Sequence, residues 1–278
     1  MAIRIGISGW TYAPWRGTFY PPRLPQRREL SYVAERLNSV EINGSFYSLQ
    51  RRSSYESWAA AVPADFCFSV KGGRFITHLK KLTDVAVPLA NFYASGVLAL
   101  GSRLGPFLWQ LPPNLGFDAT RMSTFFDQLP RTAGAAAGLA AGHDARVPED
   151  RALLQAPDPD LPLRHTVEVR HESFSNPAFY ALLREHGIGL VVADNPGKWP
   201  IIEQVTTDFM YVRLHGHEEL YASGYSEEAL DGWASKVLTW AETGQDVFVY
   251  CDNDAKVRAP YDAMGLLERV RRGSVSDR

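Results

Sequence analysis

The chain has 278 residues, of which 45% are hydrophobic and 22% are charged, as is usual for a globular protein. The formal net charge is −2, so the composition carries no global basic signal for nucleic acid. A length of this order fits one large α/β domain or two small ones. The composition is therefore that of an ordinary globular protein, and it leaves open a local basic groove.

The N-terminal sequence and the cysteines indicate the cellular compartment of the protein. The opening Met-Ala-Ile-Arg-Ile-Gly reads as a strand and not as a signal peptide. No apolar run is long enough to cross a bilayer. Cys67 and Cys251 both lie in apolar strand-like runs, as buried free thiols of a reducing compartment do. We therefore expect a cytoplasmic protein that does not contact a membrane.

Short apolar runs alternate with segments of helical periodicity along the chain. Helical patterns are expected at Glu29–Leu37, Ser54–Ala61, Ala86–Leu98, Ala119–Gln128, Pro177–His186, Glu227–Thr243 and Ala255–Arg271. Strands are expected at Ile3–Ser8, Ser39–Asn43, Phe66–Lys71, Pro106–Leu111, His165–Arg170, Gly189–Asp194, Phe209–His215 and Asp246–Asp252. Strands that alternate with helices form parallel sheets. Eight of them predict a TIM-type (β/α)8 barrel that is one domain, residues 1–278. A doubly wound open sheet is the structural alternative.

Two connections make this barrel irregular. The link from Asn195 to Asp208 contains Pro196, Gly197 and Pro200, so we expect a degenerate connection without a good helix between strands six and seven. The link from Pro130 to Arg164 is long. Its first half is rich in Ala and Gly and can be helical, whereas the prolines of its second half predict a loop.

The most informative stretch is His-Thr-Val-Glu-Val-Arg, from His165 to Arg170. Val167 and Val169 mark a strand, and Glu168 and Arg170 share its opposite face because residues i and i+2 of a strand point the same way. Buried charges are costly unless they are paired. The pattern predicts a carboxylate and a guanidinium in the interior of the protein.

Polar side chains recur in the same way at the end of every predicted strand. Ligands of parallel α/β folds bind at the carboxyl ends of the strands, and arginine and lysine there can hold an anionic or polyhydroxylated molecule. Aromatic rings at a pocket rim can stack on a sugar or a base. We therefore predict these ligand-binding residues: Trp10, Tyr12, Glu41, Asn43, Lys71, Gln110, Arg170, Arg213, Asp252 and Asn253.

Three strand-end residues are the candidates for catalysis. His215 can act as a general acid or base because imidazole titrates near neutral pH. Glu168 can act as a base or can hold an arginine in place, and Asp194 ends strand six. The structural alternative is that these charges form a salt-bridge network that only fixes the register of the barrel.

Neither a metal nor a cofactor has a clear motif. His215-Gly-His217 resembles a metal-binding pair, and nearby carboxylates could complete a divalent site. His217 follows the strand in a loop, however, so we assign no metal ligand and do not favour a required metal. There is no phosphate-binding loop, dinucleotide fingerprint, zinc-protease motif or nucleophile elbow. The identity of any cofactor stays open.

Several ordered motifs resemble one family along nearly the whole chain. They are Gly6-Ile-Ser-Gly-Trp10-Thr-Tyr12, Val40-Glu-Ile-Asn43, Phe68-Ser-Val-Lys71, Thr77-His78, Gln110-Leu-Pro-Pro113, Val167-Glu-Val-Arg170 and Tyr211-Val-Arg-Leu-His-Gly216. The family is the domain of unknown function 72, or YecE-like, family. The resemblance implies a TIM barrel and no particular reaction. This barrel is distantly similar to those of sugar isomerases and endonuclease IV, which is an analogy of fold only.

One segment departs from the family pattern. Strand eight of the family usually ends in Phe-Asn-Asn-Asp, whereas this chain has Cys251-Asp252-Asn253-Asp254. A fixed negative charge at Asp252 thus replaces an amide. Any role implied by that amide is in doubt here.

Three functions are compatible with these observations. The first is a ligand-binding or catalytic barrel that acts on an anionic, phosphorylated or sugar-like small molecule. As an enzyme it would be a hydrolase, an isomerase or a lyase. The second is a nuclease or nucleic-acid-binding barrel like endonuclease IV, which the near-neutral charge does not favour. The third is a non-catalytic regulatory protein that binds a ligand. The substrate, the reaction and the oligomeric state stay open.

Overall fold

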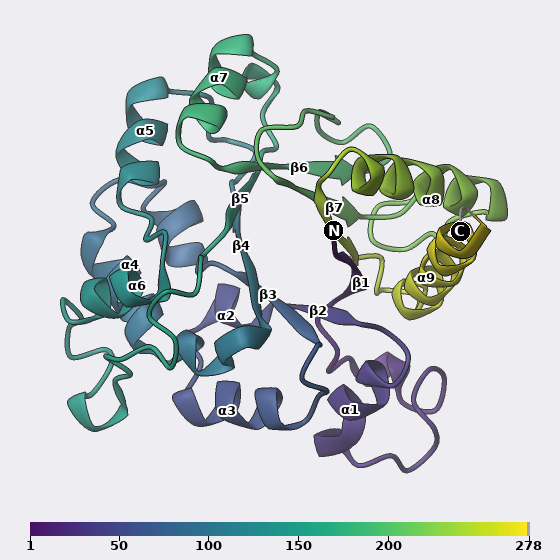
Figure 1. Ribbon diagram of the computed structural model, residues 1–278, viewed down its shortest axis with the longest axis horizontal. Coiled ribbons are helices and arrows are strands. Elements are labelled where there is room, and N and C mark those ends of the chain that lie inside the picture. Colours follow the sequence, from purple (N-terminus) through teal and green to yellow (C-terminus); the bar gives the residue numbers. More distant parts are fainter. Residues whose placement is uncertain (277–278) are drawn as a thin grey trace. The chain divides into compact units, whose positions relative to one another are not determined.

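The computed structural model describes residues 1–276, and its eight strands form a closed parallel barrel in chain order (Figure 1). This confirms the predicted TIM-type fold. The strands are β1 (Ile3–Ser8), β2 (Ser39–Ile42), β3 (Cys67–Lys71), β4 (Leu104–Gln110), β5 (His165–Glu168), β6 (Gly189–Asp194), β7 (Phe209–Leu214) and β8 (Asp246–Cys251).

Four of the α-helices begin at residues whose side chains cap the first turn. The side chains of Asp118, Thr132, Asn176 and Ser226 each accept a backbone N–H of the first turn of a helix. The helices are α1 (Glu29–Ala34), α2 (Gly44–Tyr47), α3 (Arg52–Ala60), α4 (Ala86–Ala94), α5 (Ala119–Asp127), α6 (Ala133–Ala140), α7 (Pro177–Glu185), α8 (Glu227–Glu242) and α9 (Ala259–Ser276). Residues 195–208, between β6 and β7, contain no helix, as predicted from their prolines.

Several predicted boundaries are wrong, for example that of Ala255–Arg271, which is observed as Ala259–Ser276, and two of them have a clear structural consequence. The strand expected at His165–Arg170 ends at Glu168, so Arg170 lies just beyond β5. The helix expected at Ala86–Leu98 ends at Ala94, because Gly96 adopts a left-handed conformation with φ 115° and a 3₁₀-helix, η4 (Val97–Arg103), follows it. Both differences arise at element ends, where periodicity carries the least information.

The chain divides into two compact units. The first contains Met1–Glu41 and Leu190–Arg278, and the second contains Ile42–Gly189. That the chain is one domain stays a prediction. In the first unit β1 pairs with β2 and β8, and β7 pairs with β6 and β8.

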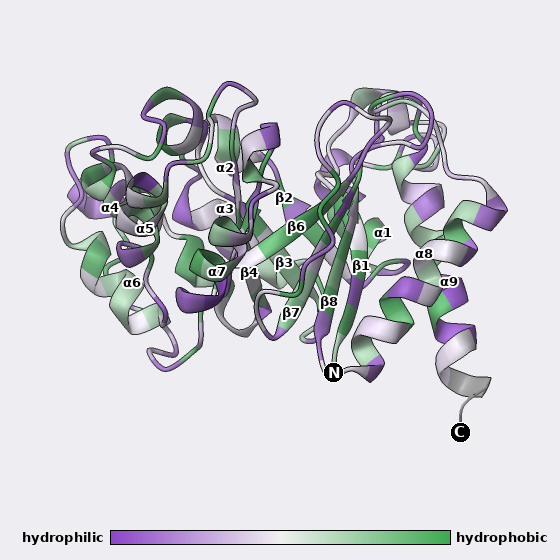
Figure 2. Cartoon of the chain, turned by 90° about the horizontal axis from the view of Figure 1, so that it is seen from above, coloured by the Kyte–Doolittle hydropathy of each residue, from purple (hydrophilic) through white to green (hydrophobic). Residues whose placement is uncertain are grey.

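Helices α8 and α9 lie side by side in the first unit (Figure 1). Both alternate between hydrophilic and hydrophobic residues, whereas the strands are mostly hydrophobic (Figure 2). Leu230 and Val237 of α8 are buried, and Leu266 of α9 is also buried. Arg269 of α9 donates from Nε to Asp231 of α8 at 2.6 Å, so an exposed ion pair joins the polar faces.

The second unit is built on β4, which pairs with β3 on one side and β5 on the other. Its core is aromatic: the Phe92 ring lies 5.8 Å from Phe107 and 5.7 Å from Trp109. The link from β4 to β5 carries α5 and α6, so the helix expected in its Ala- and Gly-rich half is confirmed. Cys67 here and Cys251 in the first unit are buried free thiols.

Candidate functional site

A buried ion pair forms the centre of the charged group in the first unit. Glu41 of β2 and Arg213 of β7 both have side chains with no exposed surface. Arg213 donates from Nη2 to Glu41 Oε1 at 2.9 Å and from Nε to Oε2 at 3.1 Å. This two-pronged contact satisfies both carboxylate oxygens, which a buried charge requires.

Two hydroxyl groups complete the environment of this pair. Tyr211 shares a face of β7 with Arg213, two residues away, and donates its hydroxyl to Glu41 Oε2 at 2.6 Å. Ser8 of β1 hydrogen-bonds to Glu41 Oε1 and accepts from Arg213 Nη2 at 2.9 Å. The network therefore joins strands β1, β2 and β7 through side chains as well as through the backbone.

Asp252, just after β8, extends the network toward its more exposed side. Its Oδ2 lies 3.0 Å from Arg213 Nη2 and 3.0 Å from His215 Nδ1. The Asp252 side chain is 13% exposed, whereas that of His215 is fully buried. Arg213 thus lies between two carboxylates, Glu41 and Asp252. The charge that replaces the family's amide at position 252 is the one that Arg213 and His215 both contact.

Asp254 is an acid in this group that the sequence reasoning did not single out. Burial and then the negative charge of Asp252 raise the pKa of Asp254 to about 6, while a hydrogen bond from Tyr12 opposes the rise. Tyr12 also donates its hydroxyl to the carbonyl oxygen of Ser8 at 2.6 Å. Trp10, predicted to bind a ligand, is buried, and its carbonyl oxygen accepts the hydroxyl of Tyr20 at 2.6 Å.

The remaining predicted residues of the first unit belong to a second polar cluster. Asp194, at the end of β6, accepts the hydroxyl of Tyr225 at 2.8 Å. Burial and the Asp194 charge hold the pKa of Tyr225 well above its usual value. The buried amide of Asn253 donates to Asp262 at 2.7 Å and to the carbonyl oxygen of Ser223 at 2.8 Å. Asp194 and Asn253 therefore hold the loop that contains Ser223 and Tyr225.

In the second unit the predicted pairing of Glu168 and Arg170 is present. Arg170 donates from Nε and from Nη2 to Glu168 Oε1, both at 2.8 Å. The Glu168 side chain is fully buried and that of Arg170 is 12% exposed. Glu168 therefore orients the guanidinium of Arg170, whose side chain lies just beyond the end of β5.

More positive charge surrounds His78, which lies in a π-helical turn, η3 (Phe75–Leu79). Burial, followed by the positive charges of Lys71, Arg170 and Arg74, lowers the pKa of His78 to about 4, and Glu168 partly opposes them. The Lys71 side chain is mostly buried at the end of β3, with Nζ 4.5 Å from the centre of the Phe46 ring. At neutral pH the imidazole is uncharged among three cations.

Gln110 and Asn43, the other predicted ligand-binding residues of this unit, lie at the end of β4 and just before α2. Gln110 ends β4 in register with Glu168 and is buried. Asn43 immediately precedes α2 and is half-buried. Gly72 after Lys71 is needed for packing, because a Cβ there would lie 2.3 Å from the Trp109 ring.

The structure thus places the predicted residues in two groups, one in each unit. The first unit brings together Glu41, Arg213, His215 and Asp252, with Asp194 and Asn253 in the neighbouring cluster. The second brings Glu168 and Arg170 together and places Lys71 near the same histidine. Within residues 1–276 no group of three or more His, Cys, Asp or Glu side chains is arranged to hold a metal ion. No helix in this range has the length and apolar character to cross a membrane.

The fold and these groups define a parallel (β/α)8 barrel of the TIM type with ionisable side chains at the carboxyl ends of its strands. A family model described as "Protein of unknown function DUF72" matches residues 4–277, and the chain belongs to this family. The resemblance seen in the sequence motifs is therefore confirmed.

Comparison with individual proteins agrees with this membership. The chain is similar to the UPF0759 protein YunF of Bacillus subtilis (strain 168), with 23% identity over 96% of this chain and 94% of that protein. It also resembles the crystal structure of a DUF72 family protein from Thermotoga maritima MSB8, with a TM-score of 0.77 and 25% identity over 98% of this chain and all of that one. A DUF72 family protein from Enterococcus faecalis V583 shares the fold, with a TM-score of 0.74 and 17% identity over 97% of this chain and 95% of that one.

Proposed function

We propose that this protein binds a small anionic molecule, phosphorylated or carboxylated, at the carboxyl ends of β3 and β5. The observation that carries the proposal is the cluster of three cationic side chains around His78. Lys71, Arg74 and Arg170 act on one half-buried imidazole, and Glu168 is the carboxylate that opposes them.

The geometry of Arg170 supports this assignment. Glu168 Oε1 receives two of its N–H groups, which fixes the plane of the guanidinium. A guanidinium held in a fixed orientation is well suited to bind a phosphate or carboxylate, because its planar N–H groups match the geometry of these anions. Lys71 supplies a second positive charge from the end of β3, which β4 separates from β5. Its low exposure reduces solvent screening and strengthens its attraction for an anion.

Binding of inorganic phosphate, followed through the imidazole of His78 by NMR, tests the proposal. Phosphate offsets the surrounding cations, so the pKa of His78 should rise from about 4 by about one pH unit at saturation. The variant Arg170→Gln should weaken phosphate binding about tenfold, because it removes a charge-assisted hydrogen bond. The matched variant Arg121→Gln removes a positive charge elsewhere in the same unit and should bind as the wild type does.

A second histidine of the same unit is an internal control. His165 is fully buried, its Nε2 lies 2.7 Å from the carbonyl oxygen of Pro130, and burial lowers its pKa to about 3. Its signals should not change with phosphate. If His78 does not respond at tens of millimolar phosphate, or responds equally in Arg170→Gln, no anion site lies at these strand ends.

Proton transfer in the first unit is a second candidate function, and Asp254 is the observation that favours it. A pKa of about 6 lets one carboxyl group exchange protons near neutral pH, which general acid–base catalysis requires. The acids and bases predicted from the sequence have fixed partners: Asp252 for His215, Tyr225 for Asp194 and Arg170 for Glu168. These contacts support a role for His215, Asp194 and Glu168 in positioning their partners. Catalysis by these three residues stays a prediction.

The titration of Asp254, followed by carboxyl ¹³C NMR, tests this candidate. Asp252→Asn restores the amide that the family usually has and removes a negative charge next to Asp254, so the pKa of Asp254 should fall below about 6. Asp231→Asn on α8 removes a charge from an exposed position in the same unit and should leave this titration unchanged. An Asp254 carboxyl that titrates near 4 in the wild type would exclude it as an acid at neutral pH.

A further inference from the structure

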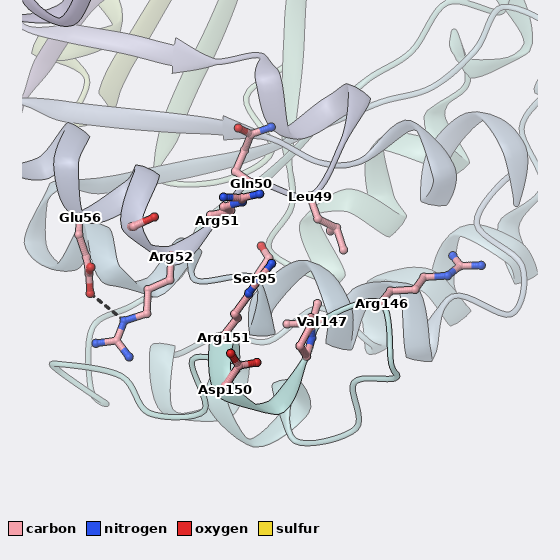
Figure 3. A pocket seen from close by; sticks show the side chains of 12 residues that line it. Leu49, Gln50, Arg51, Arg52, Glu56, Ser95, Arg146, Val147, Asp150 and Arg151 are labelled. Carbon is pink, nitrogen blue, oxygen red and sulfur yellow. Dashed lines mark hydrogen bonds and ion pairs between the residues drawn. The ribbon is translucent and has the colours of Figure 1, made fainter.

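A cavity of about 550 Å³ lies in the second unit, and its lining contains none of the residues of the proposed anion site (Figure 3). Its walls come from the segment before α3, the first turn of α3, the end of α4 and the link from β4 to β5. The lining residues are Leu49, Gln50, Arg51, Arg52, Ser53, Glu56, Ser95, Arg146, Val147, Pro148, Asp150 and Arg151. None of them is used in the proposed function.

One wall depends on a close approach of two backbones. Gly96 has φ 115°, and a Cβ there would lie 2.5 Å from the Cα of Arg52. The glycine therefore lets the start of α3 rest against the end of α4. Ser95 is buried and donates its hydroxyl to the carbonyl oxygen of Phe92 at 2.7 Å, which fixes the same corner.

The opposite wall is the second half of the long β4–β5 link, which hydrogen bonds hold in place. Asn91 of α4 donates to Asp144 Oδ1 and accepts from the backbone N–H of Asp144, both at 3.0 Å. The N–H of Leu153 donates to the carbonyl oxygen of Ala94 at 2.8 Å. The lining segment, residues 146–151, is thus anchored to α4 on both sides, so the cavity has defined walls although the link has little regular structure.

The lining is rich in arginine. Four arginines and two carboxylates line the cavity. Arg52 pairs with Glu56 at 2.7 Å (Figure 3), so Arg51 and Arg151 outnumber the remaining carboxylate, Asp150, while the Arg146 guanidinium extends away from the other lining residues (Figure 3). The Arg146 guanidinium lies 5.0 Å from the centre of the Phe75 ring. The cavity therefore has a net positive charge on a protein whose overall charge is −2.

The cavity also has an apolar side. Leu49 and Val147 belong to its lining. A smaller notch of about 70 Å³ shares Leu49 and Arg146 with it and adds the rings of Phe75 and Phe92. A ligand that carries both negative charge and an apolar part would match both sides.

We propose that this cavity is a second binding site, for a small organic molecule that carries a diphosphate. Guanidinium groups pair with phosphate oxygens through parallel hydrogen bonds, and several arginines together match more than one phosphate. A volume of about 550 Å³ lies within the range of sites for small organic ligands. The apolar side favours an organic diphosphate over inorganic pyrophosphate. The site is independent of the strand-end site, because the two have no residue in common.

Isothermal titration of the full chain with ADP and with pyrophosphate tests the proposal. ADP should bind more tightly than pyrophosphate because it also has an organic part. Arg51 and Arg151 are exposed, so the double variant Arg51→Gln/Arg151→Gln should fold, which circular dichroism can verify. Its Kd for ADP should be about 100-fold weaker, about tenfold for each lost arginine.

Two variants separate this site from other positive charges. Arg121 lines a different cavity of the same unit, and Lys71 belongs to the strand-end site. The variants Arg121→Gln and Lys71→Met should therefore each have a Kd for ADP within about twofold of the wild-type value. Loss of ADP binding in Lys71→Met but not in the double variant would place the diphosphate at the strand ends and overturn the proposal. Absence of ADP binding to the wild type would also overturn the proposal. If the protein instead bound a single-stranded oligonucleotide through Arg51 and Arg151, the cavity would be a nucleic-acid site and the proposal would be wrong.

Discussion

The charged groups of the two units differ in their charge balance. In the first unit Arg213 lies between two carboxylates, Glu41 and Asp252, and two hydroxyl groups complete the network. In the second unit Lys71, Arg74 and Arg170 surround His78, and Glu168 is the carboxylate among them. The arginine of the first group thus lies between two carboxylates, whereas the histidine of the second group lies among three cations.

The two titratable groups with shifted pKa values show the same difference. Asp254 has a raised pKa of about 6, because burial and a neighbouring carboxylate disfavour its charged form. His78 has a lowered pKa of about 4, because burial and neighbouring cations disfavour its charged form. Burial contributes to both shifts, but the neighbouring charges have opposite signs. The proposed anion site therefore lies near His78 and not near Asp252 and Asp254.

The largest effect is expected when the balanced network of the first unit is broken. In Glu41→Gln the buried Arg213 guanidinium loses its two-pronged carboxylate, although Asp252 remains beside it. Removal of one partner of a buried ion pair leaves an uncompensated charge, which costs about 3–5 kcal/mol of unfolding free energy. Urea unfolding followed by circular dichroism measures this loss.

An exposed pair of the same unit is the matched control. Glu35 pairs with Arg36 at 3.0 Å, and the Glu35 side chain is 62% exposed. Glu35→Gln should change the unfolding free energy by less than about 1 kcal/mol, because solvent screens exposed charges. Equal losses in the two variants would show that the Glu41 network contributes no more than an ordinary surface pair.

Alternation along short strands was sufficient to predict much of this arrangement. Glu41, Arg213 and Glu168 each lie among apolar residues with a period of two, and each has a fully buried side chain. Because the strands are parallel, the end of each could be assigned to the ligand-binding end of the barrel. The same rule would have found Tyr211, which shares the face of Arg213 and whose hydroxyl bonds Glu41.

Residues in turns after the strands were harder to predict. Thr77-His78 and Asp254 were visible in the motifs of the family, but periodicity does not determine the path of a chain after a strand ends. His78 lies in a π-helical turn, and Asp254 contributes through its proximity to Tyr12 and Asp252. The arginines around the cavity come from two segments about 100 residues apart, so their proximity depends on packing of α3 and α4 that no local pattern specifies.

The smallest effect is expected in the pH dependence of stability. His78 has a folded pKa of about 4 and an ordinary value of 6.5, so the unfolded chain binds more protons between these values. The contribution of His78 therefore makes stability rise with pH from about 4 to 6.5. Asp254 has a folded pKa of about 6 and an ordinary value of 3.8, so the folded chain binds more protons and its contribution makes stability fall from about 4 to 6.

Two variants separate these opposing contributions. The stability of the wild type relative to His78→Gln should increase with pH over this window, whereas its stability relative to Asp254→Asn should decrease. Urea unfolding at half-unit steps from pH 4 to 7 measures both differences, and 0.5 M NaCl should reduce them because it screens the neighbouring charges. If both differences had the same sign, the two groups would not have surroundings of opposite charge. If salt left both unchanged, burial alone would account for the two pKa shifts, and the positive charges around His78 would be too weak to attract an anion.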